Sequence, residues 1–149
     1  MSRCRLAAIA LLACTAFATP AAAQELGVRA GVSVNPDQFY FGGHAETAPL
    51  VGNLRFRPNL EVGIGDDTTL VAINLEFAYH FPSQRSWHAY AGGGPALNFI
   101  RRFGETDSEG GLNLLVGVQH TRGLFAEFKV GTLDSPDVKL GVGYAFRWR

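Results

Sequence analysis

The sequence has little cysteine, little lysine and little charge for its length. Its two cysteines, Cys4 and Cys14, both lie in the first 23 of 149 residues, so we expect no disulfide framework and no thiol chemistry in the remainder. Lys129 and Lys139 are the only lysines. Charged residues make up 17% of the chain, whereas soluble domains usually have about 25%. The surface is therefore unusual for one that faces water.

An excess of charge of one sign is also absent. The chain carries 13 basic and 13 acidic residues, which argues against a nucleic-acid partner. The part beyond the first 23 residues has no pattern typical of a long helix. No residue pattern indicates a cofactor, and we expect none.

The first 23 residues have the features of a secretory signal. Arg3 and Arg5 form a positive start, a short apolar stretch covers 6–13, and Ala21 to Ala23 form a small-residue cleavage site before Gln24. We therefore expect a signal peptide over 1–23 and a single domain over 24–149. An alternative is lipoprotein processing at Cys14, because 11–14 resembles a lipobox.

The dominant pattern in 24–149 is an alternation of apolar and polar residues, interrupted by turn residues. This pattern predicts an all-β, antiparallel up-and-down meander that closes into an approximately eight-stranded transmembrane β-barrel. Each run covers about nine to thirteen residues, close to the roughly ten that cross a bilayer at a tilt. The predicted strands are 26–34, 38–43, 53–65, 71–81, 87–99, 112–120, 124–132 and 138–148. The second is short.

Most connections between these strands are short and rich in turn residues. The segment 65–68 fits a two-residue hairpin. If Gly65 faces Thr68, the register places Arg57 opposite Glu76, as an opposite-charge pair across two strands. The longer predicted connections are 44–52 and 100–111.

The polar face of the strands is rich in glycine, alanine, serine and asparagine. Small residues suit the narrow interior of a barrel better than an exterior in water, where glycine weakens strands. We therefore predict that the apolar face contacts lipid and that the polar face forms a lumenal charge network. Its six basic and three acidic members are Arg29, Arg55, Arg57, Glu61, Glu76, Glu127, Lys129, Lys139 and Arg147.

Aromatic residues gather near strand ends, as in the two aromatic girdles of outer-membrane barrels. With a periplasmic N-terminus, one rim would hold Tyr79, Phe81, Trp87, Phe146 and Trp148, and the other Phe39, Phe41, Phe99 and Phe103. The simpler interpretation is that aromatic residues favour strands.

The last strand has a specific spacing of residues. Lys139-x-Gly141-x-x-Tyr144-x-Phe146 resembles the C-terminal assembly signal of bacterial outer-membrane barrels, which the barrel-assembly machinery reads. Such proteins usually end on the final aromatic residue, whereas Arg147, Trp148 and Arg149 follow here.

Residues 24–149 resemble the small outer-membrane barrels typified by the OmpA transmembrane domain, OmpX and the opacity proteins. The segments 90–98 and 140–146 resemble their central and final strands. The resemblance implies a monomeric barrel in the outer membrane, surrounded by lipid and lipopolysaccharide, with a lumen too narrow for an open pore. Arg101 and Arg102 are candidate contacts for lipopolysaccharide phosphates, or they belong to an ordinary solvated loop.

Three other functions were weighed. His80 and His88 lie on the polar face, but zinc sites use at least three protein ligands, so we expect rim histidines rather than a metal site. A lipid A deacylase of the PagL type needs a His-x-Ser-Asn motif, and 120–123 reads His-Thr-Arg-Gly. We therefore expect no enzyme and no catalytic residues. The principal alternative is a soluble periplasmic barrel, lipocalin-like, with an apolar ligand inside.

Overall fold

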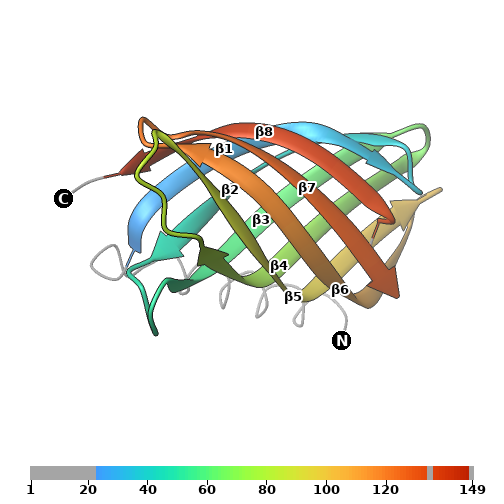
Figure 1. Ribbon diagram of the computed structural model, residues 1–149. Coiled ribbons are helices and arrows are strands. Elements are labelled where there is room, and N and C mark those ends of the chain that lie inside the picture. The colour runs from blue at the N-terminus through green and yellow to red at the C-terminus, as the bar shows by residue number, and fades with distance from the viewer. Residues whose placement is uncertain (1–22, 134–135, 148–149) are drawn as a thin grey trace.

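The computed structural model describes residues 23–133 and 136–147, which form eight antiparallel strands closed into one barrel (Figure 1). Each strand pairs with its neighbours in the chain, and β1 pairs with β8. The predicted fold class is confirmed. The strands are β1 (Ala23–Val34), β2 (Gln38–Thr47), β3 (Leu54–Gly65), β4 (Thr68–His80), β5 (Trp87–Arg102), β6 (Glu105–His120), β7 (Leu124–Leu133) and β8 (Val138–Arg147).

The register between β3 and β4 follows from their two-residue turn. Gly65 pairs with Thr68, and Arg57 lies opposite Glu76, as predicted. The closing pair places Gly31 of β1 opposite Gly141 of β8. In Figure 1 the strands are tilted against the axis of the barrel, which is the geometry that closure of a sheet requires.

Burial in this molecule is the reverse of that in a water-soluble domain. The polar face of each strand points into the lumen, and the apolar face forms the outer wall. Val142 on the outer wall is 59% exposed, whereas Arg57 and Glu76 inside the barrel are 0% exposed. The charged side chains therefore form the core, and the aliphatic and aromatic side chains form the surface.

The predicted end of the second strand was wrong. The expected strand stopped at Gly43, but β2 continues to Thr47 and pairs with β1 along this extension, with Ala45 opposite Leu26 and His44 opposite Gly27. The residues after Gly43 lack large apolar side chains on the outer face, so the alternation is weak there. The connection to β3 shortens to 48–53.

The predicted loop at 100–111 was also wrong. Most of it extends β5 and β6 as a hairpin around Phe103 and Gly104, which both have positive φ, 48° and 83°. Arg101 pairs with Thr106, and Ile100 pairs with Asp107. These strand ends carry mostly polar residues, so the alternation of apolar and polar residues did not predict them. Backbone pairing between two adjacent strands does not need apolar side chains.

The two ends of the barrel differ in their connections. At one end, the terminal end, lie the start of β1, the end of β8 and the connections 48–53, 81–86 and 121–123. At the other, the turn end, lie the turns that follow β1, β3, β5 and β7. Within the described ranges, the chain has no helix long and apolar enough to span a membrane. Trp148, predicted for an aromatic rim, lies outside the described residues.

Candidate functional site in the lumen

Six charged side chains meet in the middle of the lumen, and we call them the central cluster. They come from β1, β3, β4, β7 and β8, and each is less than 5% exposed. The members are Arg29, Glu61, Glu76, Glu127, Lys129 and Lys139.

Glu61 of β3 has three cationic neighbours. Lys129 Nζ donates to it at 3.0 Å, Arg29 Nη1 lies at 3.4 Å, and Lys139 Nζ donates to its second oxygen. Both carboxylate oxygens therefore have cationic donors. A carboxylate held in this way fills space and binds strands together, because neither oxygen is left unpaired.

Glu127 of β7 has a similar environment. It accepts from Arg29 Nη1 at 2.8 Å and from the Tyr90 hydroxyl at 2.7 Å, and Arg57 Nη1 lies at 3.2 Å. The Arg57 guanidinium also lies over two rings, 4.8 Å from the centre of Tyr90 and 5.2 Å from that of Phe125. Aromatic faces attract a cation, so they supplement the carboxylates around this fully buried arginine.

A chain of asparagines extends the network beside Glu76. Asn113 Nδ2 donates to Asn74 Oδ1 at 2.8 Å, Asn74 Nδ2 to Asn59 Oδ1 at 2.7 Å, and Asn59 Nδ2 to Glu76 at 2.7 Å. Lys129 Nζ donates to the same carboxylate at 2.8 Å. Arg57 and Glu76 lie opposite each other in register, yet no ion pair forms between them, because each finds partners across the lumen.

Two lumenal acids were missed by the sequence analysis. Glu25 precedes the predicted first strand, and Glu46 follows the predicted second strand. Both are fully buried near the terminal end, where Glu25 accepts from Gln119 at 3.2 Å and from Arg147, and Glu46 lies 3.3 Å from Arg55. With these two acids, the lumenal charge network has six basic and five acidic members among the described residues. Longer strands at both positions would have revealed them, since their alternation continues that of the strands.

The pair of histidines predicted on the polar face lies at this end too. His80 Nδ1 is 3.1 Å from His88 Nε2, and His80 Nε2 is 3.1 Å from Glu46 Oε2. Because a carboxylate accepts, His80 Nε2 donates to it, and the other ring nitrogen of His80 pairs with His88. Within 23–133 and 136–147, no three His, Cys, Asp or Glu side chains are arranged to hold a metal ion.

Glycines of the lumen make room for the largest inward side chains. A Cβ atom on Gly27 would lie 2.0 Å from His44 Cε1, and one on Gly141 would lie 2.2 Å from Tyr40 Oη. Gly141 belongs to the motif that resembles an assembly signal. Lys139 of the same motif points inward and belongs to the central cluster, where it donates to Glu61. Tyr144 and Phe146 lie on the outer wall, with their ring centroids 5.0 Å apart.

The two arginines considered for lipopolysaccharide lie on opposite faces of β5. Arg101 lies on the outward face with Leu97 and Phe99, because strand side chains alternate. Arg102 lines a cavity at the turn end. His120, weighed as an enzyme residue, packs its ring against Trp87 at 4.9 Å and accepts a hydrogen bond from the backbone of Arg122.

The fold is similar to two solved structures. The crystal structure of Neisserial surface protein A (NspA) matches with a TM-score of 0.67 and 17% identity, over 83% of this chain and 95% of that one. The N-terminal β-barrel domain of Pseudomonas aeruginosa OprF matches with a TM-score of 0.57 and 17% identity, over 84% of this chain and 99% of that one. No protein-family model and no curated protein matches the chain in sequence. These similarities show the fold.

Proposed function

We propose that this chain is a non-catalytic protein of the outer membrane, with a structural or surface-interaction role. It crosses the bilayer as a monomeric barrel whose lumen is filled by ion pairs. After export and removal of 1–23, the terminal end faces the periplasm and the turn end faces the outside.

The observation that carries the proposal is the reversed burial. In a soluble barrel, aliphatic side chains fill the interior and charged ones face water. Here large apolar side chains such as Val28 and Leu140, 56% and 57% exposed, cover the outer wall, while the charged groups lie inside. A contiguous apolar surface of this extent needs a lipid environment. The two similar structures support the proposal, since one of these proteins is named a surface protein.

Lipid, lipopolysaccharide and the assembly machinery are the proposed partners. Tyr144 and Phe146 are 41% and 54% exposed on the outer wall, where a second protein reaches them during insertion. Of the two arginines considered as contacts for lipopolysaccharide, we propose only Arg101, because Arg102 points away from the lipid face. A guanidinium group beside the apolar wall is suited to a phosphate in a lipid headgroup.

The test is fractionation of expressing cells, followed by electrophoresis of the membrane fraction with and without boiling. We expect the protein in the outer membrane, and we expect the unboiled band to migrate faster, because the hydrogen-bonded barrel stays folded in detergent. Recovery as a soluble periplasmic protein without a heat shift would contradict the proposal. That outcome would favour the lipocalin-like alternative.

The filled lumen predicts the absence of steady conduction. Arg57, Glu61 and Glu76 are at most 1% exposed in the middle of the barrel, which leaves no continuous aqueous path there. Single-channel recording in planar bilayers should therefore show no steady current. A lipid A mass profile from the same cells, unchanged by expression, separates the proposal from a lipid-modifying enzyme.

A further inference from the structure

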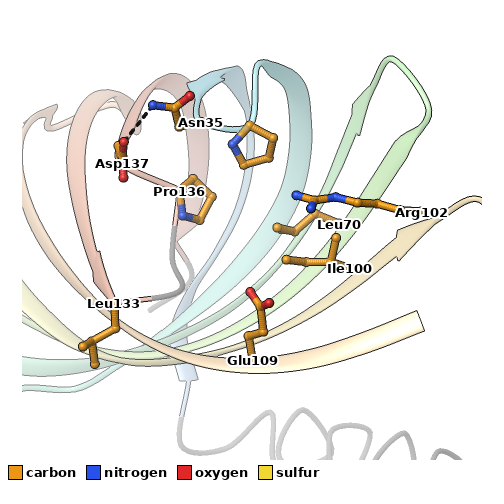
Figure 2. A pocket seen from close by; sticks show the side chains of 9 residues that line it. Asn35, Leu70, Ile100, Arg102, Glu109, Leu133, Pro136 and Asp137 are labelled. Carbon is orange, nitrogen blue, oxygen red and sulfur yellow. Dashed lines mark hydrogen bonds between the residues drawn. The ribbon is translucent and has the colours of Figure 1, made fainter. Parts of the chain in front are cut away.

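The lumen opens at the turn end into a cavity of about 340 Å³, which we call the vestibule. Figure 2 shows its lining side chains, which come from four strands and from the turns after β1 and β7. They are Asn35, Pro36, Leu70, Ile100, Arg102, Glu109, Leu133, Pro136 and Asp137. This volume lies within the range of small-molecule sites, about 300 to 1,000 Å³.

The floor of the vestibule is apolar. Leu70 and Ile100 lie opposite each other on β4 and β5 and are 2% and 8% exposed. With Ala72 they form a buried apolar cluster. This layer lies between the cavity and the asparagines and charges deeper inside. A molecule that enters the vestibule therefore meets an aliphatic surface, and it does not reach the central cluster.

Two of the three charged groups that line the vestibule have no partners among the described residues. Neither Arg102 nor Glu109 forms an ion pair or a side-chain hydrogen bond with any described residue. Figure 2 shows the Glu109 carboxylate pointing into the cavity. Asp137 is held in place, since its Oδ2 atom accepts from Asn35 Nδ2 at 2.9 Å. This bond ties the turn after β1 to the segment before β8 and fixes one wall.

The balance of charge at this mouth is acidic. Glu105 and Asp107 lie on the same face of β6 as Glu109, at alternate positions, and Glu105 is opposite Arg102 in register. The described lining of the cavity has two carboxylates, those of Glu109 and Asp137, and one guanidinium group. The carboxylates of Glu105 and Asp107 add negative charge along the hairpin beyond the cavity. Such a mouth attracts cations and repels anions, and the half-buried Glu109 has the apolar surroundings that strengthen pairing.

We propose that the vestibule binds a small organic cation, an ammonium group on a short apolar body. The ammonium lies at Glu109, and the apolar body packs on Leu70 and Ile100. The binding site itself needs only the fold. The proposed function adds the side of the membrane from which the ligand arrives.

The experiment uses the folded protein in an uncharged maltoside detergent, with ¹³C-labelled leucine and isoleucine methyl groups. The probes share one apolar body and differ in charge: 2-phenylethylamine, 2-phenylethanol and 3-phenylpropanoate. We expect the amine to shift the Leu70 and Ile100 methyl signals in a saturable way, and the other two probes to bind at least about fivefold more weakly, the effect of one charged contact. Leu75 on the outer wall reports probe that merely dissolves in the micelle.

A matched pair of variants tests the location of the charge. Glu109→Gln removes the carboxylate in the cavity, and Glu105→Gln removes one from the same strand face outside it. We expect the first to weaken amine binding at least about fivefold and the second to leave it nearly unchanged. Equal losses in both variants would overturn the inference, as would equally tight binding of the propanoate. Unmoved Leu70 and Ile100 signals would also overturn it.

Failure of this inference and failure of the proposed function give different results. A preparation that shows the heat shift but no amine binding would remove the ligand and keep the membrane barrel. A soluble periplasmic protein that binds the amine would keep the vestibule and remove the outer-membrane role. Both measurements use the same protein.

Discussion

The central cluster and the vestibule are lined by side chains on the same inward face of the strands, yet their charges behave differently. In the cluster, Glu61 and Glu127 each form ion pairs with three cationic side chains. In the vestibule, Glu109 and Arg102 have no ion-pair partner among the residues that the structure describes. Burial explains the contrast, because an unpaired charge away from water is costly, whereas the open mouth lets water solvate it. The paired charges of the central cluster therefore stabilise the barrel, whereas the unpaired charges at the turn end are available to bind a ligand.

The largest expected difference comes from removing one carboxylate charge in each region. Glu61→Gln leaves Arg29, Lys129 and Lys139 without a common counter-ion, so we expect a loss of about 3 to 5 kcal/mol in the free energy of unfolding. Glu109→Gln should change it by less than about 0.5 kcal/mol. Urea unfolding in lipid vesicles, followed by the mobility of the folded band, measures both. Similar losses in the two variants would break the comparison.

The loss of stability caused by a new charge on the outer wall should also be larger at the centre of the barrel than at its end. Val142 lies halfway along β8, opposite Ala30 and Ala126, whereas Val34 is the last residue of β1. In a bilayer, Val142→Arg should cost about 2 to 4 kcal/mol and Val34→Arg at most about 1, because the penalty falls with distance from the midplane. The same vesicle unfolding assay applies. Equal costs would contradict a membrane-spanning wall.

Packing density provides a third comparison. Gly141→Ala places a methyl group against Tyr40 Oη in the centre, while Gly110→Ala meets nothing within 4 Å at the turn end. We expect a loss of about 1 to 3 kcal/mol for the first and little change for the second. Tyr40→Phe removes the clashing oxygen, so the double variant should recover part of the loss. Additive losses would show that the hydroxyl is not the obstacle.

The smallest effect is expected at the mouth of the terminal end. His88 is half-buried, and His80 is the one side-chain hydrogen-bond partner of its ring among the described residues. His88→Ala should therefore cost about 0.5 to 1.5 kcal/mol, the value of one hydrogen bond. The terminal end would then contribute less to the free energy of unfolding than the centre and more than the vestibule. A loss as large as that of Glu61→Gln would show that the terminal mouth also belongs to the stabilising core.

The strands and their pairing were largely predictable from local pattern. Alternation with period two indicates a strand with two unlike faces, and the two-residue turn at Asp66 and Asp67 sets the register that places Arg57 opposite Glu76. The errors fell where one face lacks apolar residues. At the end of β2 and in the hairpin around Phe103, pairing with a neighbouring strand holds an extended chain that its own side chains do not reveal.

The sequence by itself determined which side chains share a face, because alternation in a strand is a property of the backbone. It also indicated that the charged face is the confined one, since glycine accompanies the charges there. Only the tertiary structure decided which charges meet. The cations around Glu61 come from positions 32, 68 and 78 residues away in the chain. Closure of the barrel and the stagger of its strands bring them together, and no local pattern encodes these partners.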